Sequence, residues 1–291
     1  MVSGDFVRRL RERPDDGSMP LRKGVFLLPN LLTTCGLFAG FFSVIASVRG
    51  DYQQAAVAVL IANVFDILDG RVARLTNTST RFGIEYDSLA DVIAFGVAPG
   101  VLIYTWGLAQ WGTMGWLAAS TYVACGALRL ARFNVQYETT EKRHFLGLPI
   151  PAAAEVIAST VLLHYYLGGD GEVTKRVTLL LVTYALAGLM VSSFKYFSFK
   201  EAPLLRRQPF WSLVAVVFVL TLVTAFPQAM LFLGFAGYAA SAPARWLYVR
   251  GKRVYLLTTR SQRGGDRTSK AGAPEHSAGV DGHGKPPRNA A

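Results

Sequence analysis

Two short segments of the chain read Asp66-Ile-Leu-Asp69-Gly70-Arg-Val-Ala73-Arg74 and, eight residues later, Gly83-Ile-Glu-Tyr-Asp87-Ser-Leu-Ala-Asp91. They place four aspartates within 26 residues, inside a stretch that otherwise has the composition of membrane-spanning helix. A carboxylate in or near hydrocarbon is costly, and four close together repel one another unless positive charge lies among them. The pattern therefore predicts a site for divalent metal ions in a membrane protein, which points to phosphate chemistry.

The composition supports a membrane protein. The 291 residues are 52% hydrophobic with a mean hydropathy of +0.31, which is too apolar for an ordinary soluble domain. We therefore expect an all-α integral membrane protein, a polytopic bundle of about eight transmembrane helices with a six-helix catalytic core plus two. The expected helices are residues 30–48, 53–74, 84–106, 112–133, 150–167, 175–194, 210–226 and 229–249.

The distribution of basic residues predicts the orientation. If these helices alternate in direction, all of the 30 Lys and Arg residues except Arg49, Lys175 and Arg176 fall on one side. The positive-inside rule makes that side cytoplasmic. We expect a multi-pass protein of the cell membrane with both termini and the aspartates on the cytoplasmic side. Because the net charge of +11 lies between apolar blocks and in the tails, nucleic acid is not an expected partner.

The chain divides into four expected regions. Residues 1–28 are a polar cytoplasmic N-terminal arm, 29–200 the catalytic core, 201–257 two additional transmembrane helices, and 258–291 a disordered basic tail. The two cysteines, Cys35 and Cys125, lie singly inside apolar blocks. They provide neither a disulfide framework nor a zinc-binding spacing.

Helical spacing brings the aspartates together. At 100° per residue, Asp66, Asp69, Gly70 and Ala73 form one stripe about 100° wide. Gly83, Asp87 and Asp91 form a similar stripe on the next helix, so two carboxylate pairs can face each other across a hairpin. All-oxygen ligation favours Mg²⁺ or Mn²⁺, and we expect two ions. Ion pairs with Arg71, Arg74 and Arg81 can explain any one aspartate but not all four.

The spacing D-x-x-D-G-x-x-A-R-x8-G-x-x-x-D-x-x-x-D resembles the signature of the CDP-alcohol phosphatidyltransferases. These integral membrane enzymes transfer a phosphatidyl or related group from a CDP-activated donor to an alcohol and release CMP. Four further segments extend the resemblance, and the last three resemble the phosphatidylserine synthase branch of the family. They are Phe26-Leu-Leu-Pro-Asn30-Leu-Leu-Thr33, the segment from Asp87 to Pro99, Gly126-Ala-Leu-Arg-Leu-Ala-Arg-Phe-Asn134, and Gly147-Leu-Pro-Ile-Pro-Ala-Ala-Ala154.

The resemblance implies roles for individual residues. Asp66, Asp69 and Asp87 would hold one metal ion, and Asp66, Asp87 and Asp91 the second. Asp91 would also be the general base. The implied contacts to the CDP-diacylglycerol donor are Gly70, Ala73, Arg74, Gly83 and, more weakly, Asn30, Thr33 and Thr80. A homodimer is also implied.

The resemblance favours L-serine as the acceptor, because Ser88 and Val92 replace the Pro and Lys of the branch that uses glycerol phosphate. For the serine carboxylate, Arg129, Arg132 and Asn134 are candidates at the cytoplasmic end of one helix. Glu155 is a candidate for the ammonium. Inositol phosphate and glycerol phosphate stay open as acceptors, and a divalent-cation transporter is an alternative of a different class.

Overall fold

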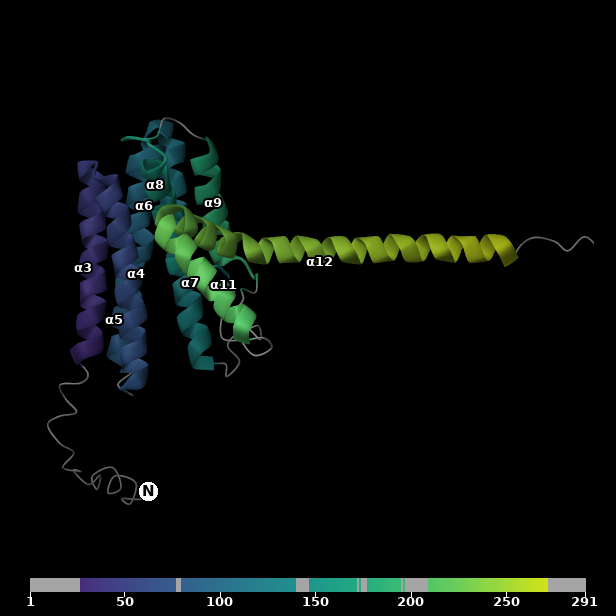
Figure 1. The fold of residues 1–291 in the computed structure, drawn as a ribbon, viewed down its shortest axis with the longest axis horizontal. Coiled ribbons are helices and arrows are strands. Elements are labelled where there is room, and N and C mark those ends of the chain that lie inside the picture. The colour runs from purple at the N-terminus through teal and green to yellow at the C-terminus, as the bar shows by residue number, and fades with distance from the viewer. Residues whose placement is uncertain are drawn as a thin grey trace, which may run out of the picture. The chain divides into compact units, whose positions relative to one another are not determined.

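The computed structural model describes residues 27–76, 80–139, 147–171, 173, 177–194, 196 and 209–271, with side chains described except at 136–139, 209–213, 215–216, 251 and 253–271. All regular structure in these ranges is helical (Figure 1). The elements are α3 (Leu27–Arg49), α4 (Tyr52–Leu75), α5 (Arg81–Asp91), η1 (Val92–Val97), α6 (Ala98–Ile103), η2 (Tyr104–Leu108), η3 (Ala109–Trp111), α7 (Thr113–Thr139), α8 (Ile150–Tyr166), α9 (Val177–Val191), α11 (Pro209–Ala225) and α12 (Pro227–Ala271).

The described helices match the expected segments when the helical stretch Arg81–Trp111 is counted as one. The largest difference is in α12, which continues to Ala271, whereas the sequence predicts a disordered tail from residue 258. No proline lies between Pro243 and Pro274, so no missing backbone N–H stops the helix there. Within this C-terminal unit (Ala244–Ala291), the Arg250 guanidinium lies 4.9 Å from the centre of the Trp246 ring. Residues 1–26 and 272–291 lie outside the described ranges.

Two described helices are long and apolar enough to cross a membrane, Leu27–Arg49 and Arg81–Trp111. A third candidate is the pair Val217–Ala225 and Pro227–Arg250, which bends by 118° at its junction. Helix α9 is apolar but has only 15 residues. The structure thus describes a helical membrane protein with two or three candidate spans, and the expected count of about eight is not confirmed.

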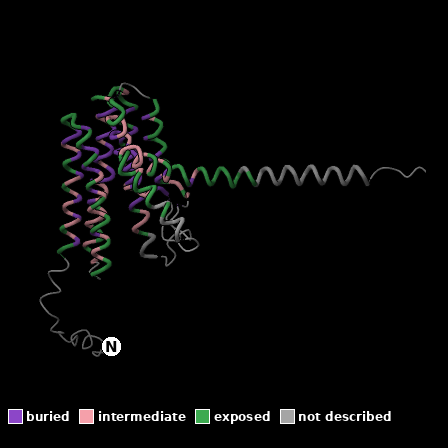
Figure 2. Tube along the Cα trace, viewed as in Figure 1, coloured by how far each residue is buried: buried purple, intermediate pink, exposed green. Residues whose placement is uncertain are grey.

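The stretch Arg81–Trp111 lies at the centre of the first compact unit, Met1–Pro243. Its segments contact α3, α4, α7 and α8. Around it, α3 packs along α4, α4 against α8, and α7 against α9, and the buried positions line the facing sides of these helices (Figure 2). Many of these positions are alanines, including Ala55, Ala62, Ala153 and Ala158. Small side chains of this kind let helix backbones approach closely where the surroundings are apolar.

One glycine sets the distance between α3 and the central stretch. A methyl group on Gly40 would lie 2.6 Å from the Cα atom of Ala94, so only glycine fits at this crossing. Ala94 belongs to the π-helical segment η1, which directly follows Asp91. The close approach therefore brings α3 beside the aspartates.

The π-helical segment is stabilised from a neighbouring helix. Pro99 has no N–H to donate to the carbonyl of Phe95, four residues earlier. The hydroxyl of Tyr122 on α7 donates a hydrogen bond to that oxygen at 3.0 Å, and Tyr122 is completely buried. This bond fixes α7 to the backbone just beyond Asp91.

We expect Tyr122→Phe to lower the free energy of unfolding by about 1–2 kcal/mol, because a buried carbonyl then loses a donor. Thermal unfolding of the purified protein in detergent measures this as a lower midpoint. Tyr184→Phe, at a tyrosine of α9 that is 37% exposed, is the matched control. Equal midpoints for the two variants would mean that the bond to Phe95 adds no stability.

Candidate active site

Three carboxylates meet where α4 faces α5. One oxygen from each of Asp66, Asp69 and Asp87 lies within 4.8 Å of the other two. Asp69 is buried, and the other two are half-buried. The prediction that the two stripes face each other across the hairpin is therefore confirmed for these three residues.

The fourth aspartate, Asp91, lines the same small cavity of about 10 Å³ as the other three. A volume of this size admits about one water-sized sphere. Asp91 is close enough to Asp66, Asp69 and Asp87 to be repelled by all three. The cavity is thus surrounded by like charges that have been partly withdrawn from water.

Two arginines reduce this repulsion without cancelling it. Arg74 interacts electrostatically with Asp66, and Arg129 with Asp91. Among the described interactions, two positive charges thus face four negative ones, which leaves an electrostatic need for bound cations. The donor set consists of carboxylate oxygens, the ligands that Mg²⁺ and Mn²⁺ prefer. The residues present therefore fit a divalent ion at Asp66, Asp69 and Asp87.

Side-chain hydrogen bonds tie the surrounding helices together and orient the site. Thr33 on α3 donates to Asp69 at 2.9 Å and so orients one carboxylate. The sequence predicted Thr33 only as a weak donor contact. Two more hydrogen bonds join neighbouring helices to α5. The hydroxyl oxygens of Thr34 on α3 and Tyr86 on α5 lie 2.9 Å apart, and the Asn134 amide on α7 donates to the Ser88 hydroxyl at 2.8 Å.

The residues expected to contact the nucleotide gather in two groups beside the carboxylates. A methyl group on Gly70 would lie 3.7 and 3.8 Å from the two terminal nitrogens of Arg74, so the guanidinium folds back over Gly70. A methyl group on Gly83 would lie 3.1 Å from the Thr80 hydroxyl oxygen and 3.2 Å from the Asn30 amide oxygen.

The second group is held by the start of α5. Thr80 caps this helix and accepts a hydrogen bond from the Gly83 N–H at 3.0 Å. Ala73 is half-buried one turn beyond Asp69 on α4.

The three acceptor candidates on α7 have different surroundings. Arg129 is 7% exposed and its Nε has no hydrogen-bond partner among the described residues. Arg132 donates to the carbonyls of Val191 at 3.0 Å and Ser192 at 3.3 Å, at the end of α9. Asn134 binds Ser88, beside the metal candidate Asp87. Arg129 also interacts electrostatically with Asp91.

Glu155 is fully buried on α8, where Asn63 and Tyr122 are its polar neighbours. Neither of its carboxylate oxygens has a described hydrogen-bond partner of good geometry. The role of Glu155 as a partner for the acceptor ammonium stays a prediction.

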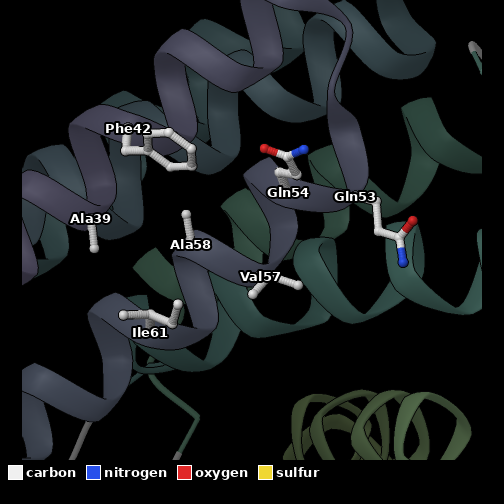
Figure 3. A pocket seen from close by; sticks show the side chains of 7 residues that line it. All are labelled: Ala39, Phe42, Gln53, Gln54, Val57, Ala58 and Ile61. Carbon is white, nitrogen blue, oxygen red and sulfur yellow. The ribbon is translucent and has the colours of Figure 1, made fainter.

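A larger groove of about 470 Å³ lies between α3 and α4. Its walls are Ala39 and Phe42 on α3 and Gln53, Gln54, Val57, Ala58 and Ile61 on α4 (Figure 3). None of these side chains ionises, and all seven are distinct from the residues around the carboxylates. The groove therefore contributes no chemistry to the site.

Some cavity residues were missed from the sequence, namely Gly36, Leu37, Ala62, Ala90, Ala94 and Phe95. Helical spacing could have predicted Ala62 and Ala94 as cavity residues, because they lie four residues before Asp66 and three residues after Asp91 on the expected helix faces. Gly36 and Leu37 lie on α3, and the sequence alone does not place α3 against the carboxylates.

Asp69→Asn gives a direct test of the charge balance. In EDTA we expect the variant to unfold at a higher temperature than the wild type, because one repelling charge is gone. With Mn²⁺ at a hundredfold excess over Kd, the wild type should gain about 2.7 kcal/mol, and the variant markedly less.

Asp51→Asn is the matched control, since Asp51 is an exposed aspartate just before α4. It should leave the response to Mn²⁺ unchanged. A wild-type protein whose unfolding temperature is the same in EDTA and in Mn²⁺ would contradict the metal site.

Comparison with known proteins identifies the family of the chain. A sequence model of the family described as CDP-alcohol phosphatidyltransferase matches residues 26–189. The chain is 38% identical over 244 residues to the CDP-diacylglycerol–serine O-phosphatidyltransferase of Helicobacter pylori (strain ATCC 700392 / 26695), which covers 81% of this chain and 98% of that protein.

Two further relatives match shorter segments. The archaetidylserine synthase of Methanothermobacter thermautotrophicus is 39% identical over 171 residues, covering 58% of this chain and 69% of that protein. The CDP-diacylglycerol–serine O-phosphatidyltransferase of Saccharomyces cerevisiae is 36% identical over 144 residues, which cover 45% of this chain and 51% of that protein. The family match contains all four aspartates and more than half of the chain, so the chain belongs to the CDP-alcohol phosphatidyltransferase family.

Proposed function

We propose that the protein is a CDP-diacylglycerol–serine O-phosphatidyltransferase, an enzyme of phospholipid biosynthesis that makes phosphatidylserine and releases CMP. The observation that carries this is the meeting of Asp66, Asp69 and Asp87 beside Asp91. The name of the Helicobacter pylori relative, which aligns over nearly its whole length, supports serine as the acceptor.

The reaction is a direct displacement. The serine hydroxyl oxygen forms a bond to the phosphorus that carries the diacylglycerol, and the bond from that phosphorus to the bridging oxygen of CMP breaks. The hydroxyl proton passes to a carboxylate and CMP leaves as an anion. Two bound Mg²⁺ or Mn²⁺ ions would stabilise the negative charge that develops on the diphosphate.

Each aspartate has a proposed role. Asp66, Asp69 and Asp87 would hold the first ion, and Asp66, Asp87 and Asp91 the second. Asp91 is the proposed general base, because it borders the cavity yet lies outside the close group of three carboxylates. A carboxylate within hydrogen-bond reach of the acceptor can take its proton and raise its nucleophilicity.

The donor nucleotide is proposed to lie along α4 and the start of α5. Arg74 would pair with the diphosphate as a charged fork, and Gly70 beneath it leaves room for the substrate. Gly83 and Ala73 leave similar space. Asn30, Thr33 and Thr80 are the proposed polar contacts, of which Thr33 also orients Asp69.

The acceptor is proposed to bind beside Arg129, with Asn134 and Arg132 nearby. Arg132 already donates to two carbonyls of α9, so Arg129 is the stronger candidate for the serine carboxylate. A phosphorylated acceptor such as glycerol phosphate or inositol phosphate carries more charge and would call for several cations. The surroundings of Asp91 favour an acceptor with one carboxylate.

The arrangement in the membrane is also a proposal. We propose about eight spans, both termini and the carboxylates on the cytoplasmic side, a core at 29–200 with two added helices at 201–257, and a basic tail. The distribution of Lys and Arg supports the orientation, and the family match over 26–189 supports the core. The proposed homodimer rests on the family resemblance.

The acceptor is tested with purified protein, CDP-diacylglycerol and Mn²⁺ or Mg²⁺. We expect CMP release with L-serine. With glycerol 3-phosphate or inositol 1-phosphate, we expect CMP release no faster than without any acceptor. Asp91→Asn should lower turnover by about 10²–10⁴-fold and keep CDP-diacylglycerol binding. Asp170→Asn, in the turn after α8, is the control with the same charge change.

Two results would count against the proposal. CMP release that does not depend on serine would remove the acceptor assignment. Normal turnover in Asp91→Asn would remove Asp91 as the base and leave the metal ligands in place.

The orientation is tested with single cysteines in a Cys35→Ala, Cys125→Ala background. We expect Ser3→Cys and Ala290→Cys to react with an impermeant maleimide only after the cells are opened. Gly171→Cys, in the short turn after α8, should react in intact cells. Equal labelling of all three positions in intact cells would refute this topology.

A further inference from the structure

We propose that the last part of helix α12, from Arg245 to Lys270, is a binding surface for the headgroups of anionic phospholipids. This surface belongs to the C-terminal unit, which begins at Ala244. It lies outside residues 26–189, the segment that the family model matches. It is also separate from the proposed active-site residues, so it would add a lipid-binding function to the transferase.

The basic residues of this segment share one face of the helix. Eight Lys and Arg lie between Ala244 and Ala271, against one acidic residue, Asp266. At 100° per residue, seven of the eight fall within an arc of about 100°, and Asp266 falls outside it. We call these seven positions the basic stripe: Arg245, Lys252, Arg253, Arg260, Arg263, Arg267 and Lys270.

The eighth basic residue, Arg250, lies away from the stripe and has a contact within the helix. Its guanidinium lies 4.9 Å from the centre of the Trp246 ring. Residues four positions apart are neighbours on a helix surface, so this cation–π contact forms along the helix itself. The basic stripe is therefore the continuous charged face of the segment.

The helix composition indicates that an external partner stabilises this segment. It contains Gly251, Gly264 and Gly265, and glycine is a poor helix former. Arg263 and Arg267 are four residues apart, a spacing at which like charges repel on a helix. The helix nevertheless continues to Ala271. Anions bound along the basic stripe would relieve this repulsion.

The place of the stripe in the chain favours a lipid surface. Residues Pro227–Arg250 of the same helix form part of a candidate membrane span, so the stripe starts at the end of that span and continues beyond it. Trp246 and Tyr248, which lie at this transition, are 44% and 71% exposed. Trp and Tyr are enriched where a helix meets the membrane–water interface. Basic clusters next to a span are attracted to anionic leaflets.

Nucleic acid is the other polyanion that a basic helix face could bind. It would account for the charges but not for the exposed aromatic residues at the end of a candidate span. An anionic bilayer accounts for both, because it presents phosphate groups directly beside the apolar layer in which such aromatic rings lie.

The range of the attraction predicts how this segment lies on the bilayer. Charges interact over about 8 Å at physiological ionic strength, whereas Arg245 and Lys270 are separated by about 38 Å along the helix. Only a helix that lies along the surface can bring both within reach of headgroups. The narrow arc of the stripe allows all seven positions to face that surface together.

A fluorescent reporter on the full-length protein tests the contact. In the Cys35→Ala, Cys125→Ala background, Thr259→Cys carries a polarity-sensitive nitrobenzoxadiazole group next to the stripe. The protein is placed in nanodiscs of phosphatidylcholine alone or with about one third phosphatidylglycerol. We expect the emission to rise and shift to shorter wavelength only in the anionic discs. About 0.5 M NaCl should reverse the change.

Loss of charge from the stripe should abolish this response. The charge-loss variant combines Arg260→Gln, Arg263→Gln, Arg267→Gln and Lys270→Gln. Each charge removed should lower the ratio of lipid-bound to free helix about fivefold. The unfolding temperature of the bundle should stay at the wild-type value, because the changes lie in the C-terminal unit.

A rearranged variant is the matched control for net charge. It exchanges four stripe residues with their neighbours, which keeps the composition but moves four charges off the stripe. We expect it to lose most of the response to anionic lipid. The exchanges are Arg260→Ser with Ser261→Arg, Gln262→Arg with Arg263→Gln, Arg267→Thr with Thr268→Arg, and Ser269→Lys with Lys270→Ser.

Three results would overturn the inference. The first is equal emission of the wild type in neutral and anionic discs, and the second is a rearranged variant that responds like the wild type. The third is a response in neutral discs to added double-stranded DNA or inorganic phosphate that equals or exceeds the response to anionic lipid. The measurement uses neither serine nor CMP release, so its outcome is separate from that of the proposed function.

Discussion

The mutual repulsion of four carboxylates at the junction of α4 and α5 is the constraint on which the rest of the structure depends. Asp66, Asp69 and Asp87 share a space less than 5 Å across, and Asp91 borders it. Withdrawn from water, such a group is unfavourable in the absence of cations. The neighbouring helices hold it together with hydrogen bonds and close packing, and divalent ions would provide the missing positive charge.

The packing of the neighbouring helices holds the four carboxylates close together. Gly40 lets α3 approach the backbone of η1, and Thr33, two turns earlier on α3, donates to Asp69 on α4. On the other side, Tyr122 fixes α7 to the π-helical turn after Asp91. An extra residue in a helical turn is a common feature of functional sites. In this chain the irregular turn, the close crossing and two of the carboxylates, Asp87 and Asp91, lie within one stretch of the central helix.

The proposed contacts to donor and acceptor come from different elements. The proposed donor contacts come from α4 and the start of α5, where the family signature lies, and from α3. The proposed acceptor contacts come from α7. Such a division lets members of one family keep the same phosphoryl chemistry and differ in the alcohol they use, because specificity depends on groups outside the metal site.

The sequence by itself determined the helical class, the eight helical segments and the meeting of the aspartates. Helical periodicity is a local property, and the residues concerned lie within 26 positions of one another. Only the tertiary structure decided which α3 groups face the carboxylates, that Arg132 donates to the carbonyls at the end of α9, and that Asn134 donates to Ser88. These contacts join residues that are distant in the chain, and their geometry depends on how the helices pack. The sequence does not show whether an arginine or a tyrosine side chain caps a helix or faces a substrate.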